Sequence, residues 1–421
     1  MPRGIWPGAL LALCGVCSSA LPADPVDEQL SALVRGDGPA ERALAGLAVA
    51  VYRGGRPIYA NAFGAARLAP DDQVLEPLRP DSLIRVASVS KTLSALVVME
   101  LVGEGALSLD EDVSRYLGWP LRNPNYPAQP ITLRQLLSHI SSIRDAGESY
   151  ILRYPKTLQD AFDPAAPEWP QRFQSGYPPG GGYEYANLNY GVVATVLERV
   201  TGQRFDELMG ERFFDAHGID GGFNVADFSA EQQQRVATLY RKRNADDVWD
   251  SAGPWYPQVD DPADGFPTAL PADADYVPGT NGAQFSPQGG ARLSLEGLGK
   301  LAQLYRNPAF DEPDWLRSET SPAGEDAWTC AYAGGLQQLR TDCGAQLTPG
   351  EERHWRGHSG EAYGLLSGVW LDADSGDALV FAITGTSFDP YTEPRGKTGF
   401  LRIEEDVVEI LLPLLRAPAA P

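Results

Sequence analysis

Residues 85–104 read RVASVSKTLSALVVMELVGE, and this stretch decides how the rest of the chain is interpreted. Its middle is strongly apolar, and Gly103 and Gly105 stand where the apolar run stops. Such a run predicts a buried helix that begins near Ser88. Ser88 and Lys91 are three residues apart, so on a helix they share a face and lie within side-chain reach.

This spacing suits nucleophilic catalysis. A serine hydroxyl is a weak nucleophile unless a base lies beside it. A lysine that is partly desolvated in a cleft has its pKa lowered, which makes Lys91 a candidate base for Ser88. The alternative is a chance Ser-x-x-Lys on a solvated helix. None of the other four lysines has a serine three residues before it, and an unpaired lysine in an apolar helix is costly.

Strand patterns lie towards the two ends of the chain, with helical patterns between them. The expected strands are 47–53, 57–63, 332–339, 365–371 and 379–384, with hairpin turns at 54–55 and 374–377. A closing amphipathic helix is expected at 401–415, and residues 246–282 are expected to be a long surface excursion. The pattern predicts an α+β fold, in which one antiparallel sheet flanked by helices comes from residues 24–106 and 325–421. Residues 107–324 would form an inserted, mainly helical lobe.

The first 23 residues have the features of a secretory signal peptide. Arg3 precedes a short uncharged apolar run that ends in small residues. The run is shorter than the roughly 20 apolar residues that a transmembrane anchor needs. We therefore predict an exported protein, periplasmic or extracellular, with no membrane span after cleavage. Lipid modification at Cys14 or Cys17 stays open.

Composition and cysteine usage narrow the class of protein. The chain has 421 residues, with 34 Lys+Arg against 56 Asp+Glu and a net charge of −22, which argues against nucleic-acid binding. Beyond the signal peptide only Cys330 and Cys343 remain. In an exported protein they are expected to form one disulfide, with two free buried thiols as the alternative.

Several motifs together resemble a known superfamily. Residues 81–91 resemble the active-site segment of the serine β-lactamases and penicillin-binding proteins, in the branch with class C β-lactamases, esterases, D-aminopeptidases and DD-carboxypeptidases. Further stretches match the superfamily in the same order: 101–117, 131–139, 177–202, 286–298 and 357–360. The resemblance therefore covers nearly all of the mature chain. The resemblance implies a β-lactamase/DD-peptidase-like fold, with Ser88 as nucleophile and Lys91 as base.

The second element of this superfamily is Tyr-x-Asn, which occurs here at Tyr59, Tyr185 and Tyr305. Tyr59 lies in an expected strand before the nucleophile, and Tyr305 ends an expected helix. Tyr185 follows a glycine-rich stretch and opens a new helix, as the resemblance requires. We therefore assign Tyr185 as the second acid/base and Asn187 as its orienting hydrogen-bond partner.

The third element is usually Lys-Thr-Gly on a strand beside the nucleophile. The literal copy at 397–399 abuts the terminal helix and leaves no room for the strands that should follow. We therefore assign residues 358–360, His358-Ser359-Gly360, because two strands and a helix are expected after them. By the resemblance, the backbone N–H groups of Ser88 and Glu361 form the oxyanion hole.

His354 and His139 are given no chemical role. The spacing of His354 from His358 is one that binds zinc on a helix, but Gly357 and Gly360 argue against a helix there. His139 matches a structural segment of the superfamily, so packing is its expected role. No metal and no cofactor are expected.

The sequence thus predicts an exported serine hydrolase that cleaves an ester or amide bond through a Ser88 acyl-enzyme, of the esterase or D-amino-acid/DD-peptidase type. Its partner would be a small-molecule or peptide substrate, and the oligomeric state stays open. A true β-lactamase is one alternative, although His358 is largely neutral at pH 7 and offers no fixed charge to a substrate carboxylate. A non-catalytic penicillin-binding-like sensor is the other.

Overall fold

The computed structural model describes residues 25–39, 41–146, 150–153, 155–261, 275–311, 331–339 and 346–416. The predicted signal peptide and both predicted disulfide cysteines, Cys330 and Cys343, lie outside the described residues, so these stay predictions. No helix within the described ranges is long and apolar enough to cross a bilayer.

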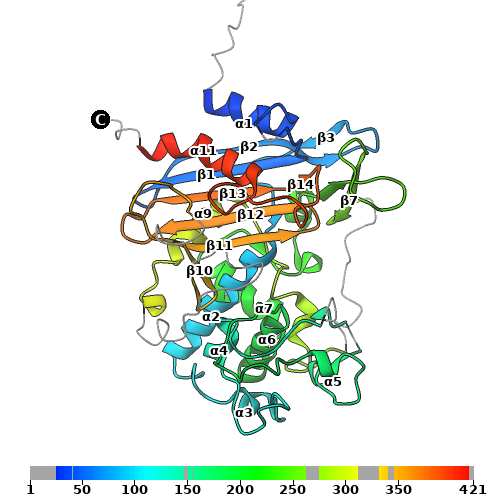
Figure 1. The fold of residues 1–421 in the computed structure, drawn as a ribbon, viewed down its shortest axis with the longest axis vertical. Helices are drawn as coiled ribbons and strands as arrows, with labels where there is room; N and C mark the ends of the chain where they lie inside the picture. Colours follow the sequence, from blue (N-terminus) through cyan, green and yellow to red (C-terminus); the bar gives the residue numbers. More distant parts are fainter. Residues whose placement is uncertain are drawn as a thin grey trace, which may run out of the picture.

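The centre of the fold is an eight-stranded antiparallel sheet in the order β3-β2-β1-β13-β12-β11-β10-β9 (Figure 1). Its strands are β1 (Gly46–Arg53), β2 (Arg56–Leu68), β3 (Val74–Pro77), β9 (Ala331–Ala333), β10 (Leu336–Leu339), β11 (Trp355–Ala362), β12 (Leu365–Asp372) and β13 (Ala378–Ile383). The two ends of the chain meet where β1 pairs with β13, with Leu47 opposite Ile383. The predicted α+β fold, with one sheet built from both ends, is confirmed.

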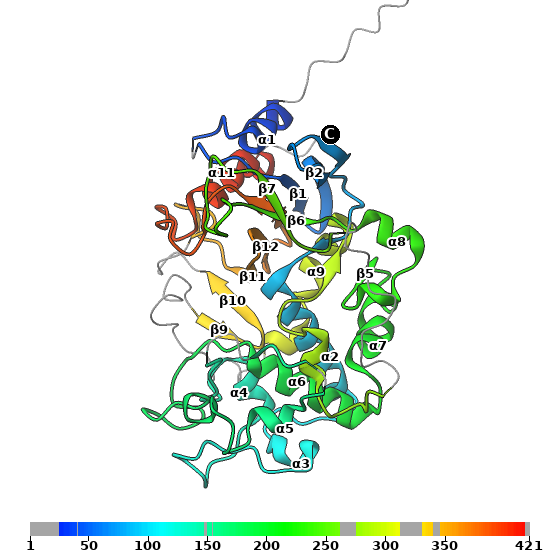
Figure 2. The same cartoon turned by 90° about the vertical axis from the view of Figure 1, so that its right-hand side faces the viewer.

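The α-helices lie on the two faces of the sheet and below it, where they form the lower part of the molecule (Figures 1 and 2). They are α1 (Pro25–Arg35), α2 (Ser90–Gly103), α3 (Val113–Leu117), α4 (Leu133–Leu137), α5 (Leu158–Ala161), α6 (Leu188–Thr201), α7 (Phe205–Met209), α8 (Ala230–Arg235), α9 (Leu295–Leu304) and α11 (Arg402–Arg416). α6 packs against α2, α3 and α4, which places α2 between the sheet and the other helices of the lower part.

Strand β1 shows why the sheet is apolar on both faces. Val49 and Val51 pack in one hydrophobic cluster with residues of α1 and α11. Ala48 and Ala50, which point the other way, pack in a second cluster with residues of α2 and α9. A strand that is covered on both sides reads as a continuous apolar run, which is how this segment appears in the sequence.

Two sequence expectations need correction. Residues 332–339 form two strands instead of one, because Gly334 and Gly335 adopt left-handed φ values of 61° and 82° and turn the chain from β9 into β10. The expected excursion at 246–282 contains strand β7 (Trp255–Val259), which pairs with β6 (Leu239–Lys242). β6 in turn pairs in parallel with β14 (Gly385–Thr386), so part of this segment belongs to a separate three-stranded sheet with the strand that follows β13.

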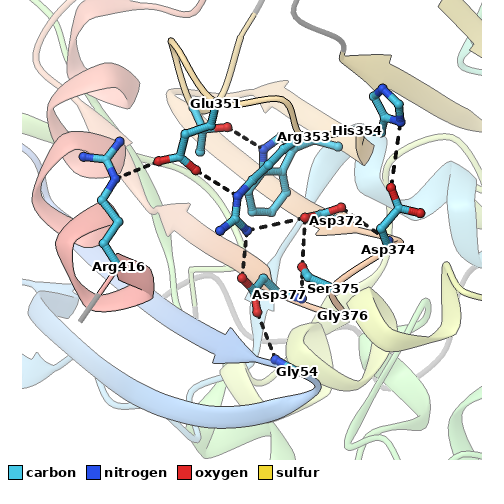
Figure 3. Close-up of polar contacts among 12 residues, drawn as sticks. Gly54, Glu351, Arg353, His354, Asp372, Asp374, Ser375, Gly376, Asp377 and Arg416 are labelled. Carbon is cyan, nitrogen blue, oxygen red and sulfur yellow. Dashed lines mark hydrogen bonds and ion pairs between the residues drawn. The ribbon is translucent and has the colours of Figure 1, made fainter. Parts of the chain in front are cut away.

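The turn between β12 and β13, expected at 374–377, is present and is held by a polar network (Figure 3). Arg353 Nη1 lies 2.7 Å from a carboxylate oxygen of Asp377, and its Nε lies 2.8 Å from Glu351. The other oxygen of Asp377 accepts a hydrogen bond from Gly54 N at 2.9 Å. Arg416 at the end of α11 pairs with the same Glu351. The network therefore joins two hairpins and the last helix at one corner of the sheet.

Candidate active site

The predicted nucleophile lies where a short strand turns into the buried helix. β4 (Ile84–Arg85) is followed by a 3-10 turn, η1 (Ala87–Val89), and α2 begins at Ser90, two residues later than expected. Ala87 has a φ of 43°, in the left-handed region that alanine rarely adopts. Backbone strain of this kind is concentrated at active sites, and here it sits directly before Ser88.

The turn that carries Ser88 is packed tightly against β11 and β12. A Cβ atom built on Gly360 would lie 2.4 Å from the carbonyl oxygen of Val86 and 3.2 Å from the Ala87 side chain. Only glycine fits at such a distance. Ser367 on β12 donates a hydrogen bond to the same Val86 oxygen at 3.0 Å. Gly360 of the predicted third motif therefore lies directly against the turn that carries Ser88.

Lys91 is fully buried, and its ammonium nitrogen points at three oxygen atoms. Nζ lies 3.0 Å from Ser88 Oγ, 2.8 Å from Asn187 Oδ1 and 3.0 Å from the carbonyl oxygen of Gln288. It also lies 4.8 Å from the centre of the Tyr185 ring. These acceptors and the aromatic face offset the cost of burying the amine.

Tyr185 completes the group around Ser88. Its hydroxyl donates to Ser88 Oγ at 2.9 Å, and its ring stacks on His139 with a centroid separation of 4.3 Å. The expectation that Tyr185 opens a helix is wrong by three residues, since α6 begins at Leu188. The packing role expected for His139 fits its complete burial, and Nδ1 accepts from Ala186 N at 3.1 Å.

Asp145 is a site residue that the sequence did not reveal. Its carboxylate accepts hydrogen bonds from Asn187 N and Nδ2, both at 2.9 Å, and from Leu188 N at 2.8 Å. Asn187 is thereby held with its Oδ1 towards Lys91. Burial raises the pKa of the Asp145 carboxyl, and the three hydrogen bonds oppose this shift. An isolated aspartate in a polar stretch gave no signal of this role.

The loop after η7 (Gly282–Phe285) supplies contacts that also went unpredicted. Gln288 uses its backbone carbonyl for Lys91, so no side-chain pattern could identify it. Ser90 Oγ accepts a hydrogen bond from Ala291 N at 3.0 Å, which holds the other end of the same loop against α2. The loop therefore packs against Lys91 and the first turn of α2.

His358 lies in β11 and is buried beside a tyrosine. Its Nε2 is 2.9 Å from the hydroxyl of Tyr332, and Nδ1 contacts the carbonyl oxygen of Ser359. Burial, with the charge of Lys91, lowers the pKa of His358 to about 3, so the ring is neutral at pH 7. Ser359 N donates to Gln337 Oε1 at 2.8 Å, and Glu361 lies opposite Leu366 in the β11–β12 pair.

The competing motif matches are placed elsewhere. Tyr59 contacts Asp27 of α1, and Tyr305 lies 3.0 Å from Thr92 inside the core. Thr398 of the literal Lys-Thr-Gly copy bonds to Glu405 in α11.

His354 is exposed and lies 3.9 Å from Asp374 (Figure 3), whereas His358 is buried. Among the described residues, no group of three or more histidine, cysteine or acidic side chains is arranged to hold a metal ion.

Curated relatives match only part of the chain. Esterase EstB of Burkholderia gladioli is 35% identical over 174 residues, which cover 39% of this chain and 43% of the esterase. A D-aminopeptidase of Cereibacter sphaeroides is 29% identical over 170 residues, covering 40% of this chain and 31% of that protein. Lovastatin esterase of Penicillium rubens is 32% identical over 193 residues, covering 39% and 45%. The chain thus matches less than half the length of these relatives.

Solved structures match nearly the whole fold at low identity. The D-amino acid amidase of Ochrobactrum anthropi SV3 has a TM-score of 0.64 at 19% identity, covering 93% of this chain and 98% of the amidase. The hydrolase EstCE1 has a TM-score of 0.63 at 21% identity, covering 92% and 97%. The family model described as Beta-lactamase matches residues 30–401. The chain therefore belongs to the β-lactamase family.

Proposed function

We propose that the chain is an exported serine hydrolase that cleaves an ester or amide bond through an acyl-enzyme on Ser88. One observation carries this proposal: the Ser88 hydroxyl lies within hydrogen-bond distance of both Lys91 Nζ, at 3.0 Å, and Tyr185 OH, at 2.9 Å. A nucleophile in contact with two groups able to move its proton is the arrangement that acyl transfer needs.

Lys91 is the proposed general base. When its amine is neutral, two N–H groups satisfy the oxygens of Asn187 and Gln288. The lone pair is then directed at the Ser88 hydroxyl and can accept its proton as Ser88 Oγ attacks the substrate carbonyl carbon. Asp145 holds Asn187 in the required orientation, so it is a positioning residue in this scheme.

Tyr185 is proposed to serve the leaving group. Collapse of the tetrahedral intermediate breaks the ester or amide bond, and the departing oxygen or nitrogen takes up the proton that Lys91 removed from Ser88, relayed through the Tyr185 hydroxyl. The backbone N–H groups of Ser88 and Glu361 are proposed to stabilise the negative charge on the carbonyl oxygen. A water molecule then attacks the carbonyl carbon of the acyl-enzyme and gives up a proton through Tyr185 to Lys91. Lys91 returns a proton to Ser88 Oγ as the acid is released.

The substrate class proposed is an ester or a D-amino-acid amide or peptide. The buried, neutral His358 supports this choice over a dedicated β-lactamase, because that position supplies no positive charge to a β-lactam carboxylate. The relatives named esterase and D-aminopeptidase, and the structural neighbour named D-amino acid amidase, are consistent with it.

The test is acylation of purified mature protein. A fluorophosphonate probe is expected to label Ser88, and p-nitrophenyl esters, D-alanyl peptides and nitrocefin are then compared as substrates. Ser88→Ala is expected to abolish labelling and turnover. Ser94→Ala removes a buried hydroxyl further along α2 that has no hydrogen-bond partner among the described residues, and it is expected to retain both. Full activity of Ser88→Ala would overturn the proposed mechanism.

Export is tested separately. Expression of the full chain with its first 23 residues in a bacterial host is expected to give a periplasmic or secreted product with a new N-terminus near residue 24. A product that stays in the cytoplasm and still begins at Met1 or Pro2 would contradict export. It would leave the proposed hydrolase activity unaffected.

A further inference from the structure

Gln337 on β10 contacts the strand that carries the predicted third motif through its side chain. Its amide oxygen, Oε1, accepts hydrogen bonds from Ser359 N at 2.8 Å and from Ser359 Oγ at 3.1 Å. A backbone N–H can only donate, so the amide must present its oxygen to Ser359. Both lone pairs of that oxygen are then used, and Gln337 is only 5% exposed. The side chain is therefore held in one orientation.

This contact replaces a backbone hydrogen bond that the sheet does not supply. The antiparallel pairing of β10 with β11 ends where Gln337 lies opposite Gly357. If the same register continued, the residue opposite Ser359 would be Gly335. Gly335 instead belongs to the turn between β9 and β10, and its N–H donates to Leu137 O at 2.8 Å. Gln337 therefore extends the pairing with its side chain, beyond the point where the backbone of β10 turns away.

The position of Ser359 matters because the residues after it lie against the turn that carries Ser88. Gly360 is so close to that turn that a Cβ atom on it would lie 2.4 Å from the carbonyl oxygen of Val86. Backbone N–H groups alternate in direction along a strand, so those of Ser359 and Glu361 point to the same side of β11, away from β12. Glu361 N–H is the donor proposed above for the carbonyl oxygen of the substrate. A displacement of Ser359 would therefore move that donor relative to Ser88.

We propose that Gln337 is a positioning residue of the active site, whose side-chain oxygen fixes Ser359 and thereby the oxyanion-stabilising N–H of Glu361. This inference rests on the proposed hydrolase function and adds a residue to the same site. Gln337 does not contact the substrate in this scheme, because it acts through the backbone of β11. An oxyanion donor stabilises charge that develops in the transition state, so its displacement lowers kcat more than it weakens substrate binding.

The test removes the amide oxygen and keeps the length of the side chain. Gln337→Met is expected to lower kcat for p-nitrophenyl acetate by about 10- to 100-fold, with little change in KM. Gln337→Asn keeps a polar amide but is one methylene too short to reach Ser359, so a loss of the same kind is expected. Gln338→Met is the matched control, because its side chain points to the opposite face of the same strand, and it should keep the wild-type kcat.

A second substrate separates a displaced donor from a destabilised protein. In the thiono analogue of p-nitrophenyl acetate, sulfur replaces the carbonyl oxygen and is a weak hydrogen-bond acceptor. The ratio of kcat/KM for the oxygen ester to that for the thiono ester is expected to fall by about tenfold in Gln337→Met. Loss of folded protein would lower both rates alike and leave the ratio unchanged. Tm is measured for each variant to confirm that it is folded.

Binding of phenylboronic acid tests the same donor without turnover, because the boronic acid forms a tetrahedral adduct with a reactive serine. Wild-type protein is expected to bind it about tenfold more tightly than Gln337→Met does. Wild-type kcat, substrate ratio and boronate affinity in a folded Gln337→Met protein would overturn the inference and leave the proposed function in place. Tighter boronate binding by wild type, with no hydrolysis of any ester or amide, would overturn only the proposed function. Failure of wild-type protein to bind the boronate would overturn both.

Discussion

Replacing Asp145 with asparagine tests whether Asp145 controls the orientation of the proposed base, Lys91, through Asn187, without contacting the substrate itself. The Asp145 carboxylate accepts three hydrogen bonds at 2.8 to 2.9 Å, two of them from Asn187. Asparagine keeps one oxygen and turns the other into an N–H donor that faces another donor. Losing one hydrogen bond to a charged group costs about 1.5–3 kcal/mol. If that energy appears in the transition state, it corresponds to a decrease in kcat of about 10- to 160-fold.

The assay is steady-state hydrolysis of a p-nitrophenyl ester, with kcat and KM measured separately. We expect kcat to fall and KM to change little, because Asp145 acts on Asn187 and Lys91 instead of on the substrate. Asp110→Asn makes the same chemical change at a carboxylate that is 64% exposed and paired with Arg134, so its kcat should stay at the wild-type level. A folded Asp145→Asn protein with kcat within twofold of wild type would refute the positioning role.

Three further predictions concern proton transfer and pH. Tyr185→Phe keeps the ring on His139 but loses the hydroxyl, so kcat should fall about 100-fold or more in the same assay, and a smaller loss would exclude Tyr185 as the proton relay. Because the pKa of His358 is about 3, the pH–rate profile should show no histidine step near 6.5, and His358→Gln should leave the shape of that profile unchanged. Burial raises the pKa of Glu404 to about 7, above its unfolded value, so stability should fall as pH rises from about 4.5 to 7. Glu404→Gln should therefore reduce the loss of Tm between pH 5 and pH 8, and an unchanged difference would contradict this origin.

Much of the fold could be predicted from hydrophobic patterns, because those patterns reflect burial on the faces of the sheet. The segment around Val49 reads as a continuous apolar strand since helices cover both of its faces. The end of α2 at Gly103 was also predicted. The hairpin at Gly334 and Gly335 was missed because apolar residues continue on both sides of the turn.

The site could be predicted only where side-chain spacing carries information. Ser88 and Lys91 lie one helical turn apart, and Tyr185 was found through the order of motifs along the chain. Asp145 and Gln288 were missed, because one acts on the backbone and amide of Asn187 and the other acts through its own carbonyl oxygen. Contacts of this kind depend on how loops fold back, which no local sequence pattern records.

The pairing of β1 with β13 also constrains the order of events in folding. Leu47 and Ile383 stand almost at opposite ends of the chain, yet they are direct neighbours in the centre of the sheet. Closing so long a loop must precede any gain from that pairing, and sheets rich in such distant contacts fold slowly. The first hairpin is made early in synthesis and must wait with an unpaired edge until β13 arrives. During that interval the chain is open to chaperones and to any transport machinery that accepts only unfolded protein.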